Sequence, residues 1–100
     1  MESTFKKYRV NPGDDYNISI QKACKNGHTE IVKLLLEDER VDPSDGDNCP
    51  IRYASQNGHV EIVKILLQDE RVDPSDAHNE AICKACENGH TDIVKILLEN

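Results

Sequence analysis

The sequence Ala-Ser-Gln-Asn-Gly-His-Val-Glu-Ile-Val-Lys-Ile-Leu-Leu occupies residues 54–67 and recurs in closely similar form on either side. Its Asn-Gly-His triplet begins at residues 26, 57 and 88, so the copies lie 31 residues apart. Other columns keep the same spacing, among them Asn17, Asn48 and Asn79. A fixed period of about 20 to 50 residues indicates stacked structural units. We therefore divide the chain into a leader, residues 1–8, and repeats at residues 9–39, 40–70 and 71–100.

Each repeat predicts a loop, a helix, a turn and a second helix. In the middle repeat, Pro50 suits the first position of a helix, and Gly58 suits the positive φ that ends one. The second helix is expected from Val60 to about Gln68, with a wide apolar stripe over residues 62–67. Helices this short are marginally stable in isolation, so stacking on the neighbouring repeat must stabilise them.

The pattern Ala-x-x-Asn-Gly-His-x-x-Ile-Val-Lys-x-Leu-Leu resembles the ankyrin repeat, and residues 49–54 resemble its Thr-Pro-Leu-His-x-Ala segment. The resemblance implies an all-α, ankyrin-type helix-turn-helix solenoid of three stacked 31-residue repeats that binds a protein and catalyses nothing. The period is shorter than the usual 33 residues, and no repeat has the Thr or the His of that segment. The Arg-Val-Asp-Pro-Ser-Asp loop is similar to short ankyrin repeats of large DNA viruses, protists and early fungi.

Charge and composition exclude several classes of function. The chain has 12 basic and 19 acidic residues, a net charge of −7, which argues against binding to a nucleic acid backbone. Four aromatic residues and no Trp argue against a surface that stacks single-stranded bases. No apolar run reaches the roughly 18 residues of a membrane span, and residues 1–10 lack a signal peptide pattern. We expect an intracellular, cytoplasmic protein with reduced cysteines, with the nucleus left open.

Metal and catalytic sites are not expected. His28, His59 and His90 share one column, so a position in the fold explains all three. Cys83 and Cys86 supply one ligand pair, but the second pair that zinc needs is missing, since Cys24 belongs to a repeat roughly 20 Å away. Residues 45–48 imitate the start of a calcium loop, which then fails at residue 49. With no catalytic motif either, we expect no enzyme activity, no cofactor, and ordinary thiols that are buried or half-buried.

The repeats differ from one another mainly at the loop tips and along the first helix. In ankyrin-like stacks these elements line a concave face that holds a protein partner, and Tyr16 and Tyr53 are the best anchor candidates. Absence of constraint would also explain the variation, and that alternative stays open. The candidate partner-binding residues are Asp15, Tyr16, Lys22, Lys25, Gly46, Asp47, Cys49, Arg52, Tyr53, Gln56, Ala77, His78, Lys84 and Glu87.

The two ends of the stack lead to a second expectation. Phe5 and Tyr8 of the leader could cover the first repeat, whereas residues 93–98 repeat the internal apolar pattern with nothing after them to cover it. We expect weak self-association through Ile93, Ile96 and Leu97. The alternative to a partner-binding module is therefore a structural fragment of a longer array, or a subunit that stacks on copies of itself.

Overall fold

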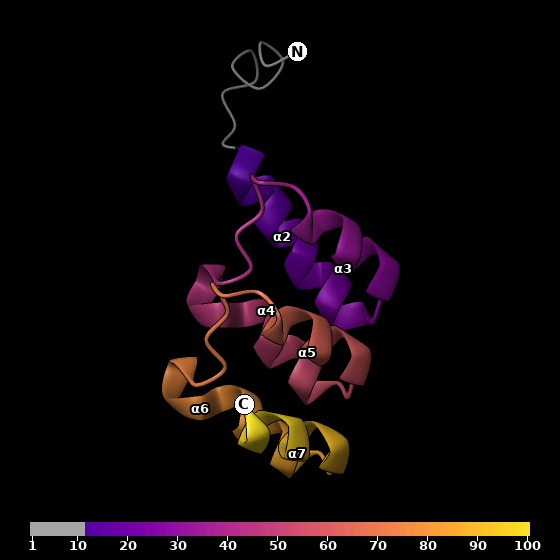
Figure 1. The fold of residues 1–100 in the computed structure, drawn as a ribbon, viewed down its shortest axis with the longest axis vertical. Helices are drawn as coiled ribbons and strands as arrows, with labels where there is room; N and C mark the ends of the chain where they lie inside the picture. Colours follow the sequence, from indigo (N-terminus) through magenta and orange to yellow (C-terminus); the bar gives the residue numbers. More distant parts are fainter. Residues whose placement is uncertain (1–11) are drawn as a thin grey trace.

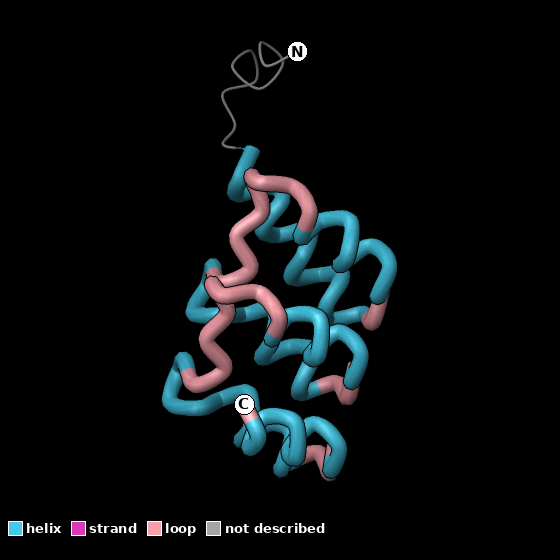
Figure 2. Tube along the Cα trace, viewed as in Figure 1, coloured by secondary structure: helices cyan, strands magenta, loops and turns pink. Residues whose placement is uncertain are grey.

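A computed structural model describes residues 12–100, with side chains from Tyr16 onward. Its helices form three antiparallel pairs that lie one above another in chain order (Figure 1). The long connections all lie along one side of the stack, and the tight turns lie along the other (Figure 2). The predicted all-helical repeat architecture is confirmed. The helices are α2 (Pro12–Asn26), α3 (Thr29–Leu36), α4 (Asp45–Gln56), α5 (Val60–Leu67), α6 (Asp76–Glu87) and α7 (Thr91–Glu99).

The leader, with its proposed cover of Phe5 and Tyr8, lies outside the described residues.

The first helices of the second and third repeats begin with a left-handed stretch. Gly46, Asp47 and Asn48 have φ values of 67°, 59° and 59°, and residues 77–79 repeat this conformation. Right-handed helical geometry follows at once, so Pro50 lies in the first turn, where its missing N–H is not needed. This left-handed stretch forms the tip of each loop.

In the first and second repeats, the turn between the two helices depends on glycine for two reasons. Gly58 has φ +78°, which confirms the predicted positive φ and favours glycine. In addition, the His90 ring of the next repeat lies so close that a Cβ on Gly58 would meet it at 2.8 Å. The same holds for Gly27 beneath His59, where the distance is 2.7 Å.

This contact explains why histidine occurs at two of the three equivalent positions in the repeats. His59 Nε2 lies 3.0 Å from the carbonyl oxygen of Lys25, and His90 Nε2 lies 3.0 Å from that of Gln56. Each imidazole thus bonds to the backbone of the preceding repeat while it covers that repeat's glycine. His28, in the first repeat, is exposed.

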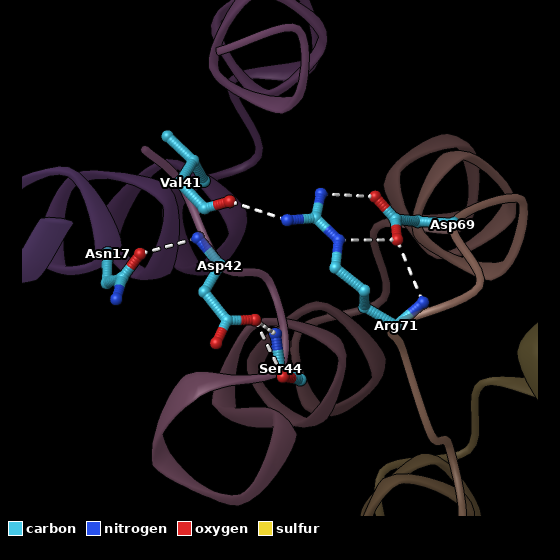
Figure 3. Close-up of polar contacts among 6 residues, drawn as sticks. All are labelled: Asn17, Val41, Asp42, Ser44, Asp69 and Arg71. Atoms are coloured by element: carbon cyan, nitrogen blue, oxygen red, sulfur yellow. Dashed lines mark hydrogen bonds and ion pairs between the residues drawn. The ribbon is translucent and has the colours of Figure 1, made fainter. Parts of the chain in front are cut away.

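Polar side chains join each repeat to the loop of a neighbouring repeat (Figure 3). Asn17 Oδ1 accepts a hydrogen bond from the Asp42 backbone N–H at 2.7 Å, and Asn48 Oδ1 accepts one from Asp73 at 2.8 Å. Arg71 donates to the carbonyl oxygen of Val41 at 2.8 Å. These bonds satisfy backbone groups that irregular loops otherwise leave unpaired.

The apolar core runs through all three repeats and is densest in the middle one. Ile51, Ala54, Ile62, Val63 and Leu66 are fully or almost fully buried. The equivalent position in the first repeat is less covered, because the described residues place a neighbouring repeat on one side of it only: Ile31 is 48% exposed, whereas Ile62 in the same column is buried.

Candidate protein-binding surface

The loop tip of the second repeat is held by a residue predicted to bind a partner. Arg52 donates from Nη2 to the carbonyl oxygen of Gly46 at 2.9 Å and from Nε to that of Asp47 at 3.1 Å. Charge-assisted bonds of this kind stabilise the carbonyls of the left-handed stretch. Arg52 therefore fixes the tip and presents Gly46 and Asp47, both exposed, to the solvent.

Variable side chains of two repeats meet at Tyr53. The Lys25 ammonium from α2 lies 5.5 Å from the centroid of the Tyr53 ring on α4, within cation–π range. A hydrogen bond with Cys49 raises the pKa of Tyr53. Lys25 is exposed, and Tyr53 and Cys49 are half-buried. The first helices of adjacent repeats thus form one continuous surface here.

Tyr16 of the first repeat forms a second, separate contact with Arg40, where the second repeat begins. The Arg40 guanidinium lies 4.2 Å from the centroid of its ring and pairs with Asp38 through two hydrogen bonds of 2.9 and 2.6 Å. These bonds lower the pKa of Asp38 from 3.8 to about 2 and raise that of Arg40. On the first repeat Lys22 is exposed, and Asp15 lies within α2, where its side chain is not described.

The third repeat contributes a differently charged section of the surface. Lys84 is half-buried between Glu80 and Glu87, with N···O distances of 3.8 and 3.5 Å. Ala77 is half-buried, and His78 and Glu87 are exposed, as is Gln56 on the second repeat.

The Asp76 carboxylate is occupied by internal hydrogen bonds. Its Oδ2 accepts a hydrogen bond from the Asn48 amide at 2.8 Å, and its Oδ1 accepts one from the backbone N–H of Ala77. Among the loop tips whose side chains are described, exposed acidic charge therefore comes from Asp45 and Asp47.

The cysteines differ from the expectation of buried or half-buried thiols. Cys24 is buried, and burial raises its pKa to about 12, but Cys83 and Cys86 are exposed. Cys86 shares its column with Cys24 and Ser55, both of which the next repeat covers. That covering contact is what Cys86 lacks.

Of the three predicted self-association residues, Ile93 and Ile96 need correction, whereas Leu97 is half-buried and lines a hollow together with Leu98. Ile93 is fully buried in the core and cannot contribute to an exposed surface. Ile96 lies in a groove with Val60 and Lys64, against the preceding repeat. The sequence missed this because consecutive apolar residues on α7 face opposite neighbours, and only stacking distinguishes them. The strongly exposed apolar residue on this helix is Leu98, at 71%.

Within residues 12–100, no three His, Cys, Asp or Glu side chains gather in a way that could hold a metal ion. None of the described helices has the length and apolar character needed to cross a membrane.

Sequence reasoning did not find the inter-repeat roles of Asn48, Arg71 or the His–Gly pair. The matching columns were visible, but they did not indicate which atoms of the neighbouring repeat each side chain reaches.

Comparison with known proteins identifies the family. Residues 4–78 match a family model described as ankyrin repeats in three copies. No curated protein and no solved structure gives a significant match. The matched segment includes the first two helix pairs and the loop into the third, and α6 and α7 repeat the same arrangement. The chain belongs to the ankyrin repeat family.

Proposed function

We propose that the chain is a non-enzymatic, protein-binding module of three repeats, with boundaries at residues 9–39, 40–70 and 71–100. Ankyrin repeats are in general protein-protein interaction modules. The proposed contact area is the variable face, defined as the loop tips and first helices that carry the candidate residues named above.

The observation that carries the proposal is the contact between Lys25 and Tyr53. Residues that differ from repeat to repeat come together here across a repeat boundary and remain partly accessible. Tyr offers a large contact area at low entropic cost, and interface hot spots are enriched in it. A partner that covers Tyr53 would also contact the loop tip that Arg52 holds.

Charge restricts the chemistry of the partner. Asp45 and Asp47 are exposed at the tip of the second loop, whereas Lys22 and Lys25 lie exposed on the first helix of the first repeat. A complementary partner has basic groups opposite the tip and acidic groups opposite α2. Four free thiols suit a reducing compartment, so we place the protein inside the cell, in the cytoplasm or the nucleus.

An affinity capture from the native cell tests the variable face. The test variant combines Tyr53→Ala with Lys25→Glu and leaves Arg52 in place, since a change at Arg52 would disturb the loop tip itself. Lys95→Glu on α7 is the control, because it changes the charge equally at an exposed site on a second helix. Loss of one captured protein with the test variant only supports the proposal. An unchanged set of captured proteins, or capture of the chain alone, contradicts it and favours the structural alternative.

A further inference from the structure

The first repeat exposes side chains that later repeats bury. Leu34 is 66% exposed, while its counterparts Ile65 and Ile96 are half-buried, and Ile31 is exposed where Ile62 and Ile93 are fully covered. Since the preceding repeat does the covering, these columns face the N-terminal end of the stack. We define the head face as His28, Ile31 and Leu34.

The third repeat exposes the opposite set of columns. Leu98 is 71% exposed, and Cys86 is exposed where Cys24 and Ser55 are buried. Two shallow hollows mark this end: one of about 390 Å³ is lined in part by Ile82 and Leu98, and one of about 230 Å³ is lined in part by Cys86 and Gly89. We define the tail face as Ile82, Cys86, Gly89 and Leu98.

The contact that joins such faces occurs twice inside the chain. His59 covers Gly27 and bonds to the carbonyl oxygen of Lys25, and His90 covers Gly58 and bonds to that of Gln56. Gly89 is the next glycine in this series, with φ +75°, and no described atom would lie within 4 Å of a Cβ placed on it. The carbonyl of Glu87 is the next acceptor in the same series.

We propose that the chain stacks head to tail on a second copy of itself, with His28 of one copy seated on Gly89 of the other. His28 Nε2 then donates to the carbonyl oxygen of Glu87, and Ile31 and Leu34 cover the hollows beside Cys86 and Leu98. A second copy fits because one chain carries both halves of a contact that it already makes internally. The faces are not self-complementary, since the histidine lies on one and the glycine that receives it on the other.

This proposal concerns a different surface from the variable face and stands independently of it. Head-to-tail contacts are heterologous and leave an open end, so the assembly grows with concentration. Each copy has a net charge of −7. Salt screens the repulsion between copies, so association is expected to strengthen as ionic strength rises.

Sedimentation of complementary variants tests the polarity of the contact. Leu34→Glu blocks the head, and Leu98→Glu blocks the tail, at sites that are mostly exposed and outside the core. Each variant alone is expected to weaken self-association at least tenfold. An equimolar mixture retains one intact head and one intact tail, and it is expected to form a dimer that grows no further. Gln68→Glu, which adds the same charge at an exposed residue in the middle repeat, is expected to behave as the wild type.

Cysteine alkylation gives a second readout that needs no substitution. As concentration rises, labelling of Cys86 is expected to slow, because the head of another copy covers it as the second repeat covers Cys24. Cys49, half-buried in the middle repeat and outside both faces, is expected to react at an unchanged rate. His28→Ala and Gly89→Ala are each expected to abolish the protection of Cys86.

Three results would overturn the proposal. A wild-type chain that stays monomeric at hundreds of micromolar in high salt contradicts it. Association of the Leu34→Glu variant at wild-type strength points to a symmetric tail-to-tail contact instead. A mixture of the two variants that remains monomeric shows that the two faces do not recognise each other.

Discussion

At the scale of single residues, glycine in the Asn-Gly-His turn has two separable roles. The backbone conformation is nearly the same at Gly58 and Gly89, with φ of +78° and +75°. Only Gly58 also receives a histidine ring from the next repeat. The repeat therefore supplies an internal comparison between backbone strain alone and strain combined with a steric clash.

Gly58→Ala is expected to destabilise the fold by about 1–2 kcal/mol more than Gly89→Ala. Both variants incur the cost of positive φ in a non-glycine residue, but only the first forces the His90 ring away and weakens its bond to Gln56. Urea denaturation at low protein concentration measures the difference. Equal losses at the two sites would contradict the stacking contact.

Three aspartates with lowered pKa values predict how the stability of the fold changes at acidic pH. Arg40 lowers the pKa of Asp38 to about 2, and hydrogen bonds to Arg71 and Ser75 lower those of Asp69 and Asp73. A carboxylate whose pKa is lower in the folded state than in the unfolded state stabilises the fold at pH values above its unfolded-state pKa, near 4. This contribution is lost as the pH falls through the folded-state pKa. The free energy of unfolding is therefore expected to decline between about pH 4 and pH 2.

Asp69→Asn is expected to flatten this decline while costing about 1 kcal/mol at neutral pH, the upper end for surface pairs, because the Asp69 side chain is only 18% exposed although that of Arg71 is 44% exposed. Denaturation series at several acidic pH values provide the measurement. A variant that shows the same slope as the wild type would assign the acid sensitivity to other groups.

At the scale of elements, the loops are fixed by asparagine side chains rather than by a hairpin. Asn48 accepts a bond from the Asp73 backbone and donates one to Asp76, so one side chain connects two consecutive loops. Asn79 occupies the same column and the same left-handed conformation in the third repeat, but it is exposed. The two asparagines thus form a matched pair.

Asn48→Ala is expected to cost about 2–3 kcal/mol, since it leaves the Asp73 N–H and the Asp76 carboxylate without their buried partner. Asn79→Ala is expected to cost under about 1 kcal/mol, mainly from the left-handed backbone. Thermal unfolding of both variants tests the difference. A cost at Asn79 that matches the cost at Asn48 would mean that conformation, not the link between loops, decides the effect.

At the scale of the whole molecule, stability is expected to be greatest in the middle. Solenoid repeats are stabilised by their nearest neighbours, and only the second repeat has a described neighbour on each side. Amide hydrogen exchange at low concentration is expected to be slowest in α4 and α5, where the most deeply buried residues lie, and faster in α3 and α7. Uniform protection across the helices would indicate that the repeats unfold as a single unit.

Much of this architecture followed from the sequence by itself. The period, the helix pairs, Pro50 in a first turn and the positive φ of Gly58 depend on residues close in the chain, so local patterns encode them. The cluster around Tyr53 was anticipated only in part: its variable columns were visible, but the use of Arg52 to hold the loop tip was not. That contact depends on a left-handed backbone that the sequence does not indicate.

Tertiary structure alone decided which face of each repeat is covered. His28, His59 and His90 follow the same Asn-Gly pair, yet one is exposed and two bind the preceding repeat. Cys24 and Cys86 share a column, yet one is buried and the other accessible. The residues within one repeat of about 31 residues determine where its helices begin and end, because these signals are local in the sequence. Burial is a property of the contact between units, so it depends on where a repeat stands in the stack.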